Sequence, residues 1–117
     1  MVVGQASIEV TGSGTCLVAR VSGEMDYTTR PALQDRFTEL VARAPFIVLD
    51  LSGVTFCDSA GLTVLLVARL RATKHAVELV VACVPPHLRT LLQMTGADQV
   101  LRVFATVADA EAAEPRA

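Results

Sequence analysis

The sequence predicts an α/β fold: a single domain with a mixed, mostly parallel sheet that is opened by a hairpin and has helices packed on it. Two near-continuous runs of β-branched and apolar residues, 46–51 (FIVLDL) and 77–83 (VELVVAC), are typical of parallel strands that are covered on both faces. Segments with helical spacing of apolar residues precede, separate and follow these runs. The 117 residues, 52% of them hydrophobic, suffice for one core.

The N-terminal part of the chain predicts a hairpin followed by an amphipathic helix. Apolar and polar residues alternate on both sides of Gly12-Ser13-Gly14, as expected for two strands joined by a tight turn. After residues 23–26 (GEMD), the segment 28–31 (TTRP) marks a helix start, and apolar residues recur at helical spacing from Leu33 onwards. Pro45 follows this pattern, so the helix should end before it.

The second half of the chain predicts two further helices and a last strand. Residues 60–74 are apolar almost all round before cations appear near the end, a pattern typical of a helix that is deeply buried at its start. Pro85-Pro86 opens a short helix, and Gly96 stands where a left-handed C-terminal cap belongs. A strand over residues 100–104 follows, and the tail from Val107 predicts at most a short helix that frays.

Composition and charge exclude several classes of function. A net charge of -2, with four Phe, one Tyr and no Trp, disfavours direct binding of nucleic acid, because few side chains can pair with phosphates or stack on bases. The sequence contains no apolar run long enough to span a membrane and no N-terminal signal pattern, so we expect a cytoplasmic protein without membrane insertion. Three isolated cysteines lack the spacing of metal or redox sites, so we expect buried free thiols, no metal and no cofactor: Cys16, Cys57 and Cys83.

A polar pair interrupts the apolar middle of the chain. The segment 55–66 (TFCDSAGLTVLL) places Asp58 and Ser59 between a strand and the buried helix. Ligands of open α/β sheets gather at such strand-to-helix corners. The simplest explanation is structural, because Asp and Ser are preferred N-cap residues whose oxygens accept hydrogen bonds from the free N–H groups of a helix start.

Three functional interpretations compete with capping. A hydrolytic nucleophile is disfavoured, because Cys57 stands where a nucleophile elbow needs Gly, and His75 and His87 are better explained as solvent-facing side chains than as a catalytic base. A nucleotide-binding corner lacks the glycine-rich motifs, and Asp58 would repel a phosphate. Phosphorylation of Ser59 would add a charge of about -1.5 to -2 on an apolar surface that another protein binds, and would so release that protein.

The same residues resemble a known family. Residues 49–62 (LDLSGVTFCDSAGL) are similar to the signature of the STAS domain in bacterial anti-sigma factor antagonists (anti-anti-sigma factors), where a strand ends in Asp-Ser-(Ser/Thr/Ala)-Gly before a helix. Two weaker motifs, within residues 23–33 and 92–101, resemble other segments of that family. The resemblance spans residues from about 7 to 110 and implies that residues 1–117 form a single STAS domain.

The resemblance implies a regulatory binding protein with no catalytic residues. In that family the unphosphorylated antagonist binds an anti-sigma factor, which is a serine kinase, and thereby frees a sigma factor. The kinase phosphorylates the motif serine, the antagonist is released, and a phosphatase resets it. Carried over to this chain, the phosphorylation site is Ser59, and the partner-binding residues are Asp26, Asp58, Ser59, Gly61 and Thr63.

Alternatives remain beside this interpretation. Asp26 is explained equally well as a cap of the helix that begins near Thr28. The domain could also be a subunit of a transporter or signalling complex that is never phosphorylated, in which case Ser59 is only a cap or a contact residue. The motif itself favours Ser59 as the acceptor, because Ala60 replaces a second hydroxyl that many relatives have. Thr63 lies one turn further into the helix and should be half-buried.

Overall fold

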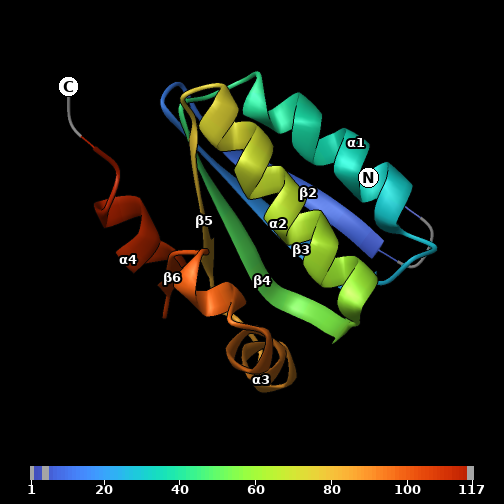
Figure 1. Cartoon of the computed structure of the whole chain (residues 1–117). Helices are drawn as coiled ribbons and strands as arrows, with labels where there is room; N and C mark the ends of the chain where they lie inside the picture. The colour runs from blue at the N-terminus through green and yellow to red at the C-terminus, as the bar shows by residue number, and fades with distance from the viewer. Residues whose placement is uncertain (1, 4–5, 116–117) are drawn as a thin grey trace.

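A computed structural model describes residues 2–3 and 6–115, in which a six-stranded sheet carries four α-helices (Figure 1). The strands follow one another in space in the order of the chain: β1 (Val2–Val3), β2 (Ala6–Ser13), β3 (Cys16–Met25), β4 (Phe46–Cys57), β5 (Glu78–Ala82) and β6 (Val103–Phe104). The helices are α1 (Arg30–Val41), α2 (Ser59–Lys74), α3 (Pro86–Thr95) and α4 (Val107–Ala112), with a short 3-10 helix, η1 (Ala97–Gln99), after α3.

The sheet is mixed and mostly parallel, as the sequence predicts. β1, β2 and β3 pair antiparallel, and the β2–β3 hairpin runs in register from Ala6 opposite Gly23 to Ser13 opposite Cys16. β3, β4, β5 and β6 pair parallel, and α1, α2 and α3 connect them in turn. The carboxyl ends of these parallel strands therefore meet at one edge of the sheet.

The helices cover the two faces of the sheet unequally (Figure 1). α1 and α2 lie on one face and, with α3, enclose the main core, in which Leu33 and Leu65 pack with Leu49 of β4. A smaller cluster on the other face includes Phe46 and Val48 of β4 beneath α4. β4 is therefore buried on both faces, which explains why its first half reads as a continuous apolar run instead of an alternating one. No helix in the described part of the chain is long and apolar enough to cross a membrane.

β4 is longer than the predicted strand. The apolar run ends at Leu51, but the strand continues to Cys57, because β3 runs beside it until Met25 pairs with Cys57. β5 pairs with β4 only as far as Asp50 opposite Ala82. The second half of β4 thus extends beyond β5 towards the beginning of α2, and residues that the sequence assigns to a connection form part of the sheet.

The C-terminal part also departs from the prediction. The last strand contains two residues instead of five, because the chain forms η1 after Gly96 and the N–H of Leu101 still bonds to the carbonyl of Ala97 at 2.9 Å. Gly96 does take the left-handed cap position, with φ 78°. The closing helix is present as α4, where the Thr106 hydroxyl accepts the N–H of Asp109 at 3.0 Å and Ala110 is completely buried.

The three cysteines are free, as predicted, but each is half-buried and not buried. Cys16 and Cys83 lie at the border of the smaller cluster, and Cys57 lies at the border of the main core. Burial raises the pKa of all three thiols. The prediction of free thiols is therefore confirmed for the three cysteines, but their side chains are less covered than predicted.

The end of α2 holds one residue in an unfavourable backbone conformation. Ala76 has φ 59°, in the left-handed region, which costs an alanine about 1–2 kcal/mol. Its N–H bonds to the carbonyl of Thr73 at 3.1 Å, and the N–H of Val77 bonds to the carbonyl of Ala72 at 2.8 Å. This pair of bonds defines a Schellman motif, in which Gly is the preferred residue at the position of Ala76.

We therefore expect Ala76→Gly to raise the free energy of unfolding by about 0.5–1 kcal/mol, because glycine adopts the left-handed conformation without strain. Thermal and urea unfolding followed by circular dichroism measures the change. Ala32→Gly provides a control with the opposite sign: Ala32 is exposed on α1, where the backbone is helical, and its replacement should lower the stability by up to about 1 kcal/mol. A lower midpoint for Ala76→Gly would show that the strain assignment is wrong.

Candidate functional site

The corner between β4 and α2 is capped by Asp58. Its Oδ1 accepts the backbone N–H of Ala60 at 2.9 Å and that of Gly61 at 3.1 Å, two of the N–H groups that a helix start leaves without helical partners. The N–H of Asp58 donates to the carbonyl of Met25, at the end of β3, at 3.3 Å. Of the two candidate caps in the sequence, Asp58 caps the helix, and Ser59 is its first residue.

Ser59 is exposed at the N-terminal end of α2. Its carbonyl accepts the hydroxyl of Thr63 at 2.9 Å. Thr63 is exposed, so the expectation that it is half-buried is wrong: its neighbours Leu62 and Val64 face the core, and Thr63 points away from it. Two hydroxyl side chains thus reach solvent on the first turns of this helix, and the first of them stands at the positive end of the helix dipole.

Gly61 lies beneath the exposed residues and is buried. A Cβ atom at this position would lie 2.3 Å from the carbonyl oxygen of Met25 and 2.8 Å from Sγ of Cys57. Only a glycine therefore allows the first turn of α2 to approach the end of β3 this closely. Gly61 determines where the backbone of Ser59 lies.

Cys57 closes the same corner from the strand side. Burial raises the pKa of its thiol to about 12, and the negative charge of Asp58 acts in the same direction. Its Sγ lies 3.6 Å from the carbonyl oxygen of Asp58. The thiol thus stays protonated at neutral pH, and since the thiolate is the reactive form, this corner contains no activated sulfur nucleophile.

Asp26 forms a second cap at the end of β3. Its Oδ1 accepts the hydroxyl of Thr28 at 2.6 Å and the N–H groups of Thr28 and Thr29 at 2.9 and 3.1 Å. The side-chain hydrogen bond from Thr28 lowers the pKa of this carboxyl, despite an opposing desolvation contribution. Its stabilising contribution is present above the ordinary carboxyl pKa and is lost as the pH falls through the lowered value. Asp26 therefore caps the turn that leads into α1, whereas the N-cap position of α1 itself is occupied by Thr29, which makes no side-chain cap bond.

Thr29 is a structural residue that sequence reasoning did not identify. It is completely buried, its hydroxyl donates to the carbonyl of Glu24 at 3.0 Å, and it accepts the N–H of Asp26 at 3.0 Å. The feature of the sequence that could have identified Thr29 is a hydroxyl residue directly before the Arg-Pro helix start. This network keeps the Asp26 carboxylate in a single orientation next to the α2 corner.

Asp26 and Asp58 are neighbours because of strand register. Each follows directly after a residue of the last β3–β4 pair, Met25 opposite Cys57. The structure thus brings together four of the five predicted site residues at the surface of one sheet edge, with Gly61 supporting them from below. Two carboxylates beside an exposed hydroxyl give this edge a negative potential.

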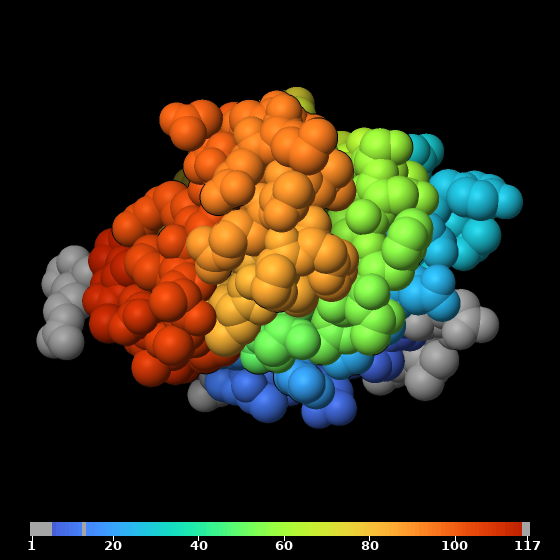
Figure 2. Space-filling view, turned by 90° about the horizontal axis from the view of Figure 1, so that it is seen from below, coloured from blue at the N-terminus to red at the C-terminus, as the bar shows by residue number. Residues whose placement is uncertain are grey.

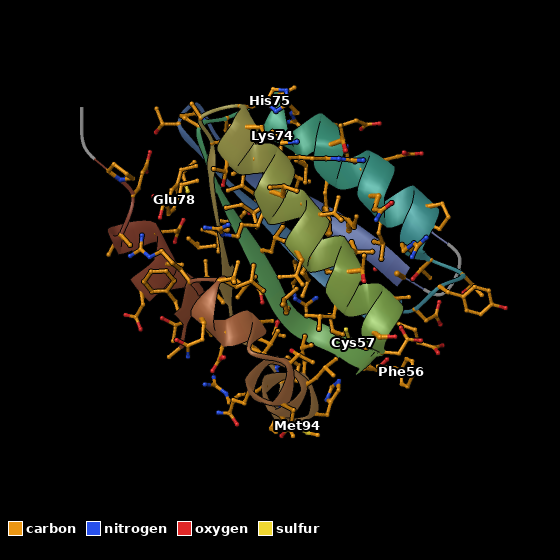
Figure 3. The ribbon with its side chains drawn as sticks, in the orientation of Figure 1. Phe56, Cys57, Lys74, His75, Glu78 and Met94 are labelled. Atoms are coloured by element: carbon orange, nitrogen blue, oxygen red, sulfur yellow. The ribbon has the colours of Figure 1, made fainter. Side chains whose placement is uncertain are left out.

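Exposed apolar side chains lie around this corner. Tyr27 is 75% exposed, Phe56 46% and Met94 81%. Figure 3 shows Phe56 and Met94 at the same end of the molecule as Cys57, and in Figure 2 α3 packs beside the end of β4 and the start of α2. Exposed apolar side chains of this kind are common at protein contact sites.

Comparisons with known proteins agree on one family. The sequence model described as "STAS domain" matches residues 7–110. An "Anti-sigma F factor antagonist" of Paenibacillus polymyxa is 30% identical over 99 residues, which are 83% of this chain and 85% of that protein. An "Anti-sigma-F factor antagonist RsfB" of Mycobacterium tuberculosis is 31% identical over 105 residues, covering 89% of this chain and 85% of the relative.

A solved structure extends this similarity to three dimensions. The crystal structure of an anti-sigma factor antagonist from Mycobacterium paratuberculosis superimposes with a TM-score of 0.83 at 32% sequence identity. The superposition covers 93% of this chain and 93% of that one. The similarity in three dimensions therefore extends over most of the fold.

Proposed function

Because the chain belongs to the STAS domain family, we propose that it is an anti-sigma factor antagonist, as its curated relatives are named. In this proposal, residues 1–117 act as one cytoplasmic STAS domain with a binding role and no catalytic role. The domain binds an anti-sigma factor serine kinase while Ser59 is unphosphorylated, which frees a sigma factor. Phosphorylation of Ser59 releases the domain, and a phosphatase restores the binding form.

The main support for this proposal is that Asp58 caps the helix and leaves the Ser59 side chain free to be modified. The Asp58 carboxylate accepts the hydrogen bonds of the helix start, so the Ser59 side chain is not needed as a cap. Ser59 is also exposed, which allows the active site of a kinase to reach its hydroxyl. A phosphoryl group there leaves every hydrogen bond of the cap in place.

The electrostatics of the corner explain how a phosphoryl group can act on binding without unfolding the domain. A negative charge at a helix N-terminus is favourable by roughly 0.3–1 kcal/mol. In a protein interface, the same charge loses its water and faces the adjacent carboxylates of Asp26 and Asp58. A 100-fold loss of affinity requires about 2.7 kcal/mol, which the burial of an unpaired dianion readily supplies.

The exposed residues around Ser59 define the proposed binding surface. A kinase that transfers a phosphoryl group to Ser59 has to cover this hydroxyl, and a stable protein interface buries about 800 Å² on each partner. An area of that size includes Asp26, Thr63 and the apolar side chain of Phe56. The partner should therefore present apolar groups opposite Phe56 and hydrogen-bond donors opposite the carboxylates.

Incubation with purified anti-sigma factor kinases and Mg-ATP, followed by intact mass measurement, tests the proposal. We expect one added phosphoryl group, absent from Ser59→Ala and retained in Thr63→Ala, which removes the exposed hydroxyl one turn further along the same helix. A phosphoryl group on another residue would contradict the assignment. No transfer from any kinase that binds the domain would instead favour a STAS subunit that is never phosphorylated.

A further inference from the structure

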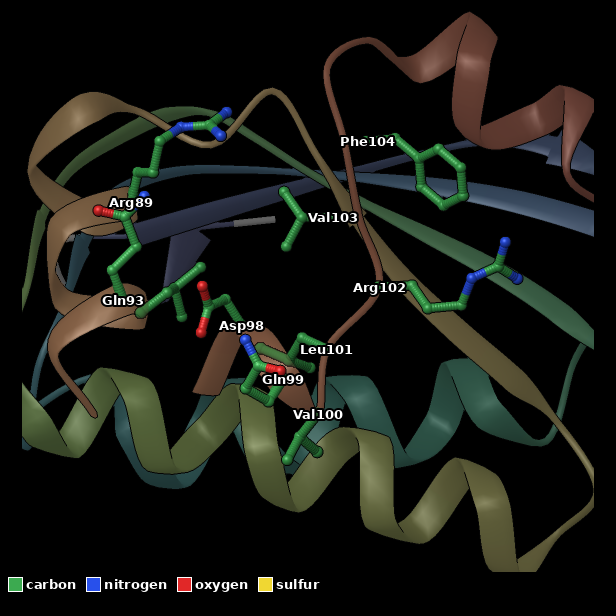
Figure 4. Close-up of a pocket in the computed structure, with 10 residues that line it drawn as sticks. Arg89, Gln93, Asp98, Gln99, Val100, Leu101, Arg102, Val103 and Phe104 are labelled. Atoms are coloured by element: carbon green, nitrogen blue, oxygen red, sulfur yellow. The ribbon is translucent and has the colours of Figure 1, made fainter. Parts of the chain in front are cut away.

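A pocket lies between α3 and the segment that follows it, and none of its lining residues belongs to the Ser59 corner. Its volume is about 510 Å³, within the range of small-molecule sites. α3 forms one wall, and η1 with the segment leading into β6 forms the other (Figure 4). The exposed Val100 and the half-buried Val103 supply apolar surface inside it, and the buried side chains of Leu92 and Leu101 lie behind this surface.

Opposite charges face this pocket from its two walls. Arg89 lies on α3, and Asp98 lies on η1. In Figure 4 the Asp98 carboxylate points into the pocket, and the Arg89 side chain lies at its rim. The ion pairs among the described residues are Arg36–Glu39 and Arg102–Glu78, so Arg89 and Asp98 pair neither with each other nor with another described residue.

Arg102 does not add a second free cation. Its side chain lines the pocket, but its guanidinium bonds to Glu78 and lies 5.1 Å from the ring centre of Phe104. Figure 4 shows this guanidinium pointing away from the pocket. The charges that remain available to a bound molecule are therefore one positive and one negative, on opposite walls. The side-chain amides of Gln93 and Gln99 line the pocket beside them.

The edge of the sheet supplies a further pair of hydrogen-bonding groups. β6 is the last strand, and the carbonyls of Arg102 and Phe104 accept the N–H groups of Val81 and Cys83 at 3.0 and 3.2 Å. The carbonyl of Val103, between these two, consequently faces away from β5, and the N–H of Val103 faces the same way. One donor and one acceptor of the backbone thus lie on the outer edge beside the pocket.

We propose that this pocket binds a free α-amino acid with an aliphatic side chain. The ligand carboxylate pairs with Arg89, its ammonium pairs with Asp98, and the backbone groups of Val103 complete the polar contacts. The aliphatic side chain covers Val100 and Val103. A ligand with only one of the two charges leaves the opposite protein group desolvated and unpaired, so the site discriminates against it.

Titration of the isotope-labelled full chain with L-leucine, followed by NMR, tests this inference. We expect saturable shifts of the backbone amides of residues 89–93 and 98–104, with a dissociation constant of about 1 mM or lower. 4-Methylpentanoate lacks the ammonium group of leucine, and 3-methylbutylamine lacks its carboxylate. Both should bind at least about tenfold more weakly.

Matched variants separate the pocket from general surface effects. Arg89→Gln and Asp98→Asn should each weaken L-leucine binding at least about tenfold, because each removes one charged partner. Arg43→Gln and Asp35→Asn make the same changes at exposed positions outside the pocket and should leave binding unchanged. All four variants should keep the unfolding midpoint of the parent chain. Equal binding of the singly charged probes, unchanged binding by Arg89→Gln, or no saturable shift would overturn the inference.

Discussion

Ser59→Asp should bind the anti-sigma factor kinase about 100-fold more weakly than the parent chain, whereas Ser59→Ala should bind within about threefold of it. The aspartate places a permanent negative charge at the first residue of α2, beside the Asp58 carboxylate. Within the interface this charge is desolvated and repelled by the neighbouring carboxylates. The alanine removes only a hydroxyl that the cap does not use.

Calorimetry or surface plasmon resonance with the purified kinase measures this difference, and circular dichroism checks that the folded state is unchanged. Thr63→Asp is the matched control, because it introduces the same charge on the same helix one turn away. We expect a smaller loss of affinity for Thr63→Asp than for Ser59→Asp. The proposed switch would be refuted if Ser59→Asp bound the kinase as tightly as the parent chain does.

Gly61→Ala should lower the free energy of unfolding by about 3 kcal/mol and the thermal midpoint by about 10–20 °C. The added methyl group would lie 2.3 Å from the carbonyl oxygen of Met25, so the helix has to move away from β3. The obstacle is a backbone atom in a paired strand, which cannot rotate aside as a side chain could. The shift would also displace Ser59 and weaken kinase binding.

Gly14→Ala separates this steric effect from the ordinary cost of replacing a glycine. An added Cβ at Gly14 meets nothing within 4 Å, but the residue has φ 67°. Its replacement therefore carries only the backbone strain of about 1–2 kcal/mol and should leave kinase affinity unchanged. Equal stability losses for the two variants would show that the contact between α2 and β3 is looser than the distances indicate.

Most of the helices and strands can be predicted from local sequence, because the turns, caps and apolar patterns that form them involve residues close together in the chain. The apolar run 46–51 identifies the central strand, and Gly12-Ser13-Gly14 identifies the hairpin, although β2 extends through Ser13 and the turn itself lies at residues 14–15. Gly96 ends α3 in the left-handed conformation that its type favours. The Asp58-Ser59 pair marks the corner where α2 begins, since capping depends on residues within one turn of each other.

The residues at which strands begin and end could not be predicted from local sequence in the same way. Residues 52–57 carry Ser, Gly and Thr and form a strand only because β3 pairs with them as far as Cys57, through two shifts of register. Conversely, Val100 and Leu101 are apolar enough for a strand, but their N–H groups bond to the carbonyl of Ala97 in η1, and β6 begins only at Val103. In both cases the pairing partner lies far away in the sequence, where local patterns carry no information.

By itself the sequence determined that this is an α/β domain of the STAS family with Asp58 and Ser59 at the entrance of a buried helix. Only the tertiary structure decided that Asp58 caps α2 while Ser59 stays exposed. It also decided that Asp26 lies beside these two residues and that Gly61 packs against Met25. The same holds for the pocket between Arg89 and Asp98. Propensity and capping act over a few residues, whereas strand register and close packing join distant segments and exist only once the chain has folded.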